Sequence, residues 1–90
     1  MNFTIESNEI YLLNDENIKL AYVKFPSVDE TTVIVTTTYV SEVLRGMGIA
    51  AKLMDTLYSE LKRTNRKAIM KCSYAESYFK KNTLKQDILK

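Results

Sequence analysis

"EVLRGMGIAAKLMDTL" (residues 42–57) contains both glycines of the chain, two positions apart and directly before a long amphipathic stretch. Apolar residues then recur three or four positions apart, at Ile49 or Ala50, Leu53, Met54, Leu57 and Leu61. This spacing predicts a helix that begins near residue 49, and Asn65 is a plausible place for it to stop. Gly46 and Gly48 therefore lie where a turn becomes a helix.

The two glycines have two interpretations. The first turn of a helix presents N–H groups without internal partners and partial positive charge, so it can bind an anion such as phosphate. Gly46 and Gly48 would keep side chains out of its way, Ala50 would keep the next turn small, and Arg45 would add a cation. Alternatively, the glycines only supply the positive φ angles of a turn. The spacing matches neither a dinucleotide fingerprint nor a Walker loop, so both interpretations stay open.

The forty residues before this stretch have the pattern of β-strands. "NFTIES" (2–7) and "EIYLLN" (9–14) flank a predicted hairpin turn, and "IKLAYVKF" (18–25) alternates in the way of a strand. "TTVIVTTTYV" (31–40) is so rich in β-branched residues that it favours one extended strand. Four strands with short connections predict an antiparallel meander.

After the helix, "KAIMKC" (67–72) predicts a fifth strand and "YAESYFKKN" (74–82) a short final helix. A strand, a helix and a strand in this order normally form a right-handed crossover with the two strands parallel. The expected order is therefore ββββαβα, a mixed α/β fold in a single domain of residues 1–90.

Composition excludes several kinds of chemistry. The chain has no histidine, which rules out a Ser-His-Asp triad and His-ligated metals, and Cys72 is the only cysteine, which argues against a zinc site; we expect no metal. The chain shows no signal peptide and no apolar run of about 20 residues, so we expect a cytoplasmic protein without a membrane partner. A net charge of +2, with Tyr11, Tyr22 and Phe25 expected on different strands or faces, argues against nucleic acid.

Two segments resemble a known family. Residues 45–50, "RGMGIA", resemble the acetyl-CoA-binding motif Arg/Gln-x-x-Gly-x-Gly/Ala of the GNAT superfamily of N-acetyltransferases, and they follow a strand that ends in Tyr39 and Val40. "KCSYAESYFKKN" (71–82) resembles the Cys-x-Tyr/Phe-Ala/Val-x-x-x-Phe segment of a small GNAT-like subfamily without the N-terminal helices. The resemblance covers roughly residues 18 to 89 and implies a minimal GNAT fold.

The resemblance also implies a pose for acetyl-CoA. The diphosphate would lie on the helix start, and the pantetheine arm would run along the backbone of Tyr39 and Val40. The thioester would sit where the fourth and fifth strands splay apart, close to Cys72. The cofactor-binding residues implied in this way are Tyr39, Val40, Arg45, Gly46, Met47, Gly48, Ile49 and Ala50.

Catalytic candidates follow from the same resemblance. Tyr78, in preference to Tyr74, would protonate the CoA sulfur, unless both are simply core or rim aromatics. Cys72, which the resemblance places near the thioester, has two interpretations of its own. It accepts the acetyl group and passes it on, by a covalent route unusual for this superfamily, or it only lies beside the thioester as a small buried side chain. No general base stands out, because Glu42 and Glu76 have the character of surface or helix-end charges.

Two departures from the family pattern bear on these shared catalytic details. Met47 stands where relatives often have Gln, and residues 36–38 are threonines where relatives often have a histidine. Neither should prevent cofactor binding.

The leading hypothesis is an acetyl-CoA-binding protein that acts as an N-acetyltransferase on an unidentified amine, carried by a protein or by a small molecule. The alternative is a non-catalytic acetyl-CoA or CoA sensor, or an accessory subunit. Dimer formation by two copies of the chain stays open as well, because a small domain with an incomplete acceptor site has a reason to pair.

Overall fold

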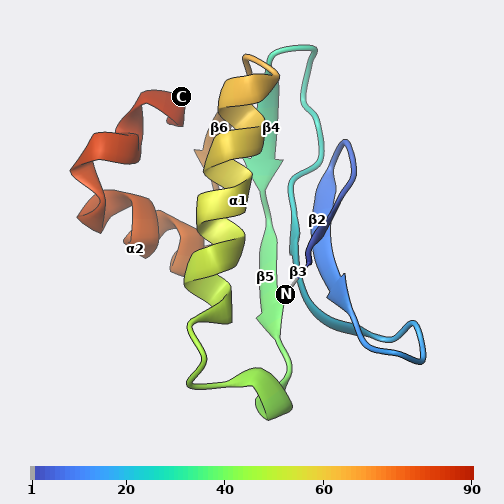
Figure 1. The fold of residues 1–90 in the computed structure, drawn as a ribbon. Coiled ribbons are helices and arrows are strands. Elements are labelled where there is room, and N and C mark those ends of the chain that lie inside the picture. Colours follow the sequence, from blue (N-terminus) through green and yellow to red (C-terminus); the bar gives the residue numbers. More distant parts are fainter. Residues whose placement is uncertain (1) are drawn as a thin grey trace.

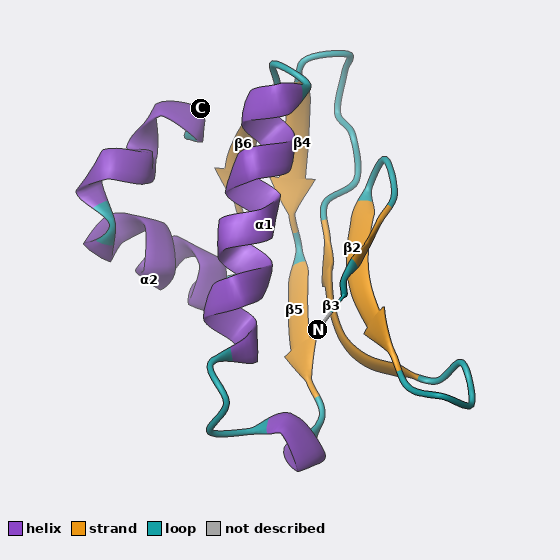
Figure 2. Ribbon diagram, in the orientation of Figure 1, coloured by secondary structure: helices purple, strands orange, loops and turns teal. Residues whose placement is uncertain are grey.

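The computed structural model describes residues 2–90. Its strands are β1 (Thr4–Ile5), β2 (Glu9–Leu13), β3 (Lys19–Lys24), β4 (Thr32–Val35), β5 (Thr37–Val40) and β6 (Lys67–Met70). Its helices are α1 (Ile49–Arg63) and α2 (Ser73–Lys81), with 3₁₀ helices η1 (Glu42–Leu44) and η2 (Thr83–Ile88). Both α-helices lie in one layer, α1 lengthwise in front of β4, β5 and β6 and α2 beside it (Figures 1 and 2).

The predicted mixed α/β order is confirmed, with an antiparallel sheet in the order β1-β2-β3-β5 and a parallel pair of β4 and β6 joined through α1.

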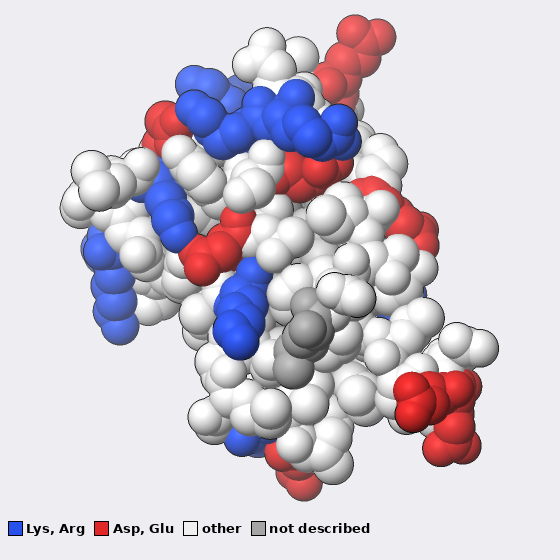
Figure 3. Space-filling model, viewed as in Figure 1, with Lys and Arg blue, Asp and Glu red and all other residues white. Residues whose placement is uncertain are grey.

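Helix α1 ends as expected. Thr64 is its C-cap and Asn65 follows at φ 56°, the left-handed geometry that commonly ends a helix. Basic side chains gather over this C-terminal end of α1, where Lys62 and Arg63 lie in the last turn and favour the negative end of the helix dipole (Figure 3).

The expectation of one continuous strand over 31–40 was wrong, because the strand breaks at Thr36. The Thr36 amide donates to the Lys24 carbonyl at 3.0 Å, while Thr37 is the register partner of Lys24. Two residues thus oppose one, as in a β-bulge, and the strand bends there. Before the break β4 pairs with β6, and after it β5 pairs with β3 alone.

The end of the chain also differs from expectation. The strand predicted over 67–72 ends at Met70, because the amides of Lys71 and Cys72 both donate to the Val35 carbonyl, at 2.9 and 3.0 Å, and turn the backbone into α2. The segment after α2 forms η2, an element that the sequence pattern did not predict.

The core lies between α1, α2 and the inner face of the sheet. Its buried residues are Ile10, Leu12, Ala21, Val23, Phe25, Val33, Val35, Ile49, Leu53, Met54, Leu57, Leu61, Ala68, Ala75, Phe79 and Ile88. The helix stripe predicted from the sequence is the part of α1 that faces this core. Among the helices of residues 2–90, none has the length and apolar character needed to cross a membrane.

One buried cation ties distant segments together. Arg66, only 9% exposed, donates from Nη1 to the Ser7 carbonyl and from Nε to the Thr64 hydroxyl, both at 2.8 Å. Its guanidinium carbon lies 5.7 Å from the centre of the Phe25 ring. Arg66 therefore fastens the β1–β2 turn to the end of α1.

The face of the sheet opposite α1, called the outer face below, carries a row of tyrosines. Tyr11 pairs with Tyr22, and Tyr22 pairs with Tyr39, whose ring is stacked on it at a centroid distance of 5.3 Å. As expected, these aromatic side chains lie on different strands or faces: Tyr11 is on β2, Tyr22 is on β3, and Phe25 is buried in the core. Tyr11 and Tyr22 nevertheless share the outer face. The register between neighbouring strands determines which tyrosines lie side by side on one face, and the sequence of a single strand does not reveal that register.

Candidate functional site

The start of α1 is an open turn. Gly48 is the N-cap at φ 72°, and Gly46 lies at φ 82°. Within residues 2–90, the amides of Gly48, Ile49 and Ala50 make no backbone hydrogen bond, and no side chain caps the helix. Three N–H donors and the positive end of the helix dipole are thus directed outward.

Both interpretations of the glycines have structural support. A φ near +70° is costly for any residue with a side chain, so the turn itself requires glycine. A Cβ atom built on either glycine would meet nothing within 4 Å, so the space above the helix start is open. The turn and an unobstructed approach to the amides are therefore properties of the same two residues.

The other residues predicted to bind the cofactor surround this turn or lead to it. Arg45 is exposed at the rim, Met47 is 52% exposed, and Ile49 is buried in the core with only its backbone at the turn. Ala50 is half-buried in the first turn of α1. Tyr39 and Val40 close β5, which runs beside the first turns of α1 (Figure 1).

The strands splay apart beyond Val35. Up to that residue β4 is paired with β6, and past it β5 and the start of α2 diverge. Thr38 pairs with the buried Val23, so its side chain points to the α1 side of the sheet. There the Cys72 Sγ lies 3.4 Å from Thr38 Oγ1. The side chains of Cys72 and Thr38 therefore meet between β5 and the N-terminus of α2.

Cys72 has polar surroundings for a partly buried thiol. Burial acts to raise the pKa of its thiol, but hydrogen bonds from the Thr38 hydroxyl and from the amides of Ala75, Tyr74 and Thr38 outweigh burial and lower the pKa. Cys72 is also the N-cap of α2, where the helix dipole favours a negative charge. This arrangement stabilises the thiolate, which is the nucleophilic form of cysteine.

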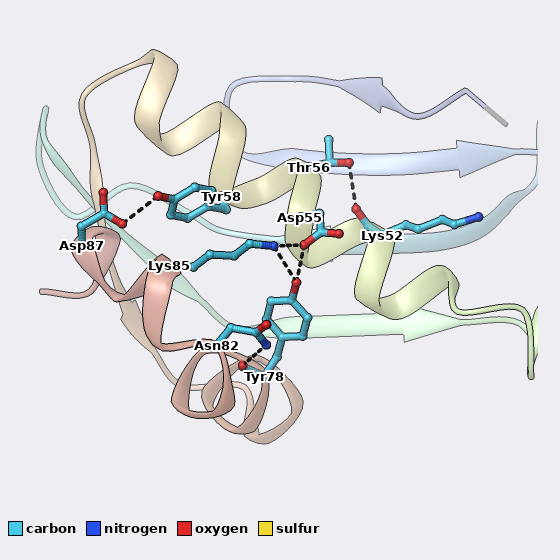
Figure 4. A network of polar contacts seen from close by, with 8 residues as sticks. All are labelled: Lys52, Asp55, Thr56, Tyr58, Tyr78, Asn82, Lys85 and Asp87. Carbon is cyan, nitrogen blue, oxygen red and sulfur yellow. Dashed lines mark hydrogen bonds and ion pairs between the residues drawn. The ribbon is translucent and has the colours of Figure 1, made fainter.

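Tyr78 projects from α2 toward α1 and η2 (Figure 4). Its hydroxyl donates to the Asp55 carboxylate and accepts from Lys85 Nζ at 3.1 Å, and Lys85 also pairs with Asp55. Burial and the hydrogen bond to Asp55 raise the pKa of Tyr78. The hydroxyl partners of Tyr78 thus lie on α1 and η2, whereas the thiol of Cys72 contacts β5.

Tyr74 lies one helical turn before Tyr78, with the two ring centres 6.4 Å apart, and is 40% exposed. Burial and the charge of Asp55 raise the pKa of its hydroxyl. Asp55 and Lys85 could not be predicted as partners of these tyrosines, because both have the sequence pattern of ordinary surface charges.

A second contact anchors the same segment. The hydroxyl of Tyr58 donates to Asp87 Oδ1 at 2.8 Å (Figure 4). Lys62 pairs with the other oxygen of Asp87. Together with Lys85 and Asp55, these groups hold η2 against α1.

The Asp55 contacts predict a dependence of stability on pH. Burial acts to raise the pKa of Asp55, but hydrogen bonds from Lys85 and Tyr78 outweigh it and lower the pKa in the folded state. The stabilisation is therefore present above the unfolded pKa of about 4 and is lost as the pH falls through the folded pKa. We expect Asp55→Asn to lower the melting temperature at pH 7, and we expect this difference from wild type to shrink as the pH falls from 5 to 3.

Asp15→Asn, a change of the same kind in an exposed turn, is the matched control and should leave the melting temperature unchanged at pH 7 and at pH 3. A difference between Asp55→Asn and wild type that persists undiminished at pH 3 would show that the charge of Asp55 contributes nothing.

Within residues 2–90, no three side chains of the His, Cys, Asp or Glu type lie together as a metal site would require.

Comparisons with known proteins agree with this architecture. The model of the GCN5-related N-acetyltransferase family matches residues 9–88. A GCN5-like candidate N-acetyltransferase from Staphylococcus aureus, solved by NMR, is 29% identical at a TM-score of 0.80, over 99% of this chain and 87% of that chain. A comparison with curated proteins finds no match.

Larger proteins share the fold. Tetrahymena GCN5 is 17% identical at a TM-score of 0.65, over 81% of this chain and 48% of that chain. A GNAT-family N-acetyltransferase from Escherichia coli, solved in complex with CoA, is 22% identical at a TM-score of 0.59, over 69% of this chain and 38% of that chain. This chain thus spans less than half the length of these two proteins. With four-fifths or more of its residues matched by the family model, the chain belongs to the GCN5-related N-acetyltransferase family.

Proposed function

We propose that this protein binds acetyl-CoA and transfers the acetyl group to an amine. The open, glycine-lined start of α1 beside β5 is the observation that carries the proposal. Family membership supports it, and so does the fold shared with a relative solved in complex with CoA. The amides of Gly48, Ile49 and Ala50 and the guanidinium of Arg45 would hold the diphosphate, and Gly46 and Met47 would shape the turn around it.

The pantetheine arm would lie along the backbone of Tyr39 and Val40, toward the splay where Cys72 and Thr38 meet. Acetyl-CoA supplies an activated thioester. The overall reaction forms a bond from the amine nitrogen to the acetyl carbon, breaks the C–S bond, and moves the proton that the amine loses to the sulfur of CoA. Backbone N–H groups of β5 would polarise the carbonyl oxygen.

Cys72 is the side chain that we propose to meet the acetyl group. Its lowered pKa and its place at the start of α2 suit a nucleophile that accepts the acetyl group before the amine does. Tyr78 would serve as proton donor only after its hydroxyl leaves Asp55, because that hydroxyl already donates there.

The test combines calorimetry with an assay of CoA release on wild type, Cys72→Ala and Cys72→Ser. We expect all three to bind acetyl-CoA equally, and both variants to lose about 100-fold or more in kcat/KM, since the Ser hydroxyl is not ionised at neutral pH. Full activity in Cys72→Ser would show that Cys72 only packs beside the thioester. No binding by folded wild type would remove the proposed function altogether.

The second candidate function is a non-catalytic sensor of acetyl-CoA or CoA. The observation in its favour is the engagement of the Tyr78 hydroxyl by Asp55 and Lys85, which leaves the proposed proton donor occupied. Tight binding without CoA release in the presence of every amine tested would favour this candidate.

A further inference from the structure

We propose that Thr38 is a positioning residue for Cys72: its hydroxyl orients the Sγ atom of Cys72 between β5 and α2 and stabilises the thiolate. This inference rests on the proposed acetyl transfer, in which Thr38 would act through Cys72 and not on the acetyl group. In the first step Sγ bonds to the acetyl carbon, the C–S bond of acetyl-CoA breaks, and the thiol proton ends on the sulfur of CoA. The amine nitrogen then takes the acetyl group, and the proton that it loses returns to Sγ.

The register of β5 determines where the Thr38 side chain lies. Thr38 is opposite Val23, which is fully buried, so its side chain lies on the α1 side of the sheet. Successive side chains of a strand alternate between the two faces, so the side chain of Thr37 lies on the outer face. The Sγ atom of Cys72 lies 3.4 Å from Oγ1 of Thr38. Of these two neighbouring threonines, Thr38 is therefore the one whose hydroxyl contacts the thiol.

The backbone amide of Thr38 points the same way. Ser41 donates to the Leu20 carbonyl at 2.7 Å, and these residues are opposite each other when the ladder of β3 and β5 is continued by one pair. Hydrogen-bonded and non-hydrogen-bonded pairs alternate along an antiparallel ladder, so Val23 and Thr38 form a pair of the second kind. The Thr38 amide is thus directed away from β3, at the free edge of the sheet. One residue presents both a hydroxyl and an N–H group to Cys72.

A hydroxyl can serve both forms of the thiol. In the thiol form Sγ donates to Oγ1 of Thr38, and when the thiolate forms the hydroxyl can rotate and donate to Sγ. A hydrogen bond to a charged group is stronger than one between neutral groups, so this contact favours the thiolate. In agreement with this, the Thr38 hydroxyl is the first of the groups that lower the pKa of the Cys72 thiol against the effect of burial. The β-branched side chain of threonine is stiff, which holds the hydroxyl in place.

The charged side chains around Cys72 contribute less than this hydroxyl. The titratable groups on the surrounding elements are Lys71 directly before it, Tyr74 and Glu76 on α2, and Asp55 on α1. Strand β5 carries no charged residue. The largest contributions to the pKa of the Cys72 thiol come from burial, the Thr38 hydroxyl and backbone amides, not from any of these charges. Removing the hydroxyl would therefore remove the main side-chain support of the thiolate.

The test measures the ionisation of Cys72 in the absence of acetyl-CoA. Cys72 is the only cysteine, so the rate of alkylation by iodoacetamide as a function of pH reports this one thiol. We expect Thr38→Val, which keeps the backbone amide, to raise the pH midpoint of alkylation by about 1, because one hydrogen bond to the thiolate is lost. The rate at pH 7 should fall by up to about tenfold, and the gap should close as the pH rises past both midpoints. Thr38→Ser retains the hydroxyl and should follow wild type.

Thr37→Val is the matched control, because it removes a hydroxyl from the neighbouring position of β5 on the other face of the sheet. Its alkylation profile should coincide with that of wild type. A Thr38→Val profile that coincides with wild type would overturn the inference, and so would a Thr38→Ser profile that coincides with Thr38→Val. If Thr38→Val does not fold, Thr38→Ala removes the same hydroxyl and should show the same change.

An assay of CoA release separates this inference from the transferase proposal. With Cys72 as the nucleophile, Thr38→Val should lose up to about tenfold in kcat/KM at pH 7. If the alkylation profile of Thr38→Val is displaced and no variant releases CoA, the positioning role of Thr38 stands and the transferase proposal fails. If wild type releases CoA and the alkylation profiles coincide, the transferase proposal stands and the positioning role fails.

Discussion

Gly48→Glu should weaken the binding of acetyl-CoA by at least about 100-fold. The new carboxylate would project into the open space above the first turn of α1, where the diphosphate is proposed to lie. Two like charges about 4 Å apart near a protein surface repel by about 4 kcal/mol, more than the 2.7 kcal/mol that a 100-fold loss requires. Isothermal titration calorimetry with acetyl-CoA and with CoA measures the change directly.

Gly48→Ala is the matched control, because it imposes the same backbone strain without the charge. At φ 72° either side chain costs about 1–2 kcal/mol of folding stability, so both variants should unfold at similar denaturant concentrations. A Cβ atom meets nothing within 4 Å, so Gly48→Ala should keep most of the affinity. If the two variants bind acetyl-CoA equally well, the glycines serve the turn alone and the diphosphate lies elsewhere.

Phe79→Ala should destabilise the protein by about 3–5 kcal/mol, which is a large part of the 5–15 kcal/mol typical of a small domain. Phe79 is fully buried, and its ring packs edge-on against Tyr78 at a centroid distance of 5.1 Å. Losing this ring leaves a cavity under α2, the helix that begins at Cys72 and carries Tyr78. Urea unfolding should therefore show a much lower midpoint.

Two further variants keep this prediction testable if Phe79→Ala fails to fold. Phe79→Leu retains most of the volume and should cost only about 1 kcal/mol. Leu84→Ala removes a large apolar side chain that is 93% exposed, and it should leave the unfolding midpoint unchanged. A loss of stability in Leu84→Ala as large as in Phe79→Ala would mean that burial does not determine the effect.

The periodicity of the sequence predicted those features of the fold that depend on neighbouring residues, such as the buried face of α1 and the end of this helix. The stripe from Ile49 to Leu61 determines which side of α1 is buried, and Asn65 ends the helix through its own backbone preference. The glycines could be identified as a turn with an open approach because both properties depend on the missing Cβ atom. Cys72 was placed near the splay through the family resemblance, and its contact with Thr38 is consistent with that position.

Features that depend on pairing between distant segments could not be predicted. The β-branched run of residues 31–40 favours extended backbone throughout, and only hydrogen bonds to Lys24 and to β6 break it at Thr36. The contact of Tyr78 with Asp55 joins residues 23 positions apart on two helices, so no spacing within either helix announces it. The tyrosine row likewise depends on the register between strands, which one sequence leaves open.

The contacts of Arg66 have a consequence for the length of α1. The first turn of this helix forms the proposed diphosphate site, and Arg66, just beyond its end, holds the Ser7 carbonyl of the β1–β2 turn. Fifteen residues at 1.5 Å each set these two ends about 22 Å apart. An insertion or deletion of one residue within α1 would turn the two ends of the helix by about 100° relative to each other and change their separation by about 1.5 Å. The turn at residues 14–17 faces no such constraint, so natural variation in chain length should accumulate in that hairpin and spare α1.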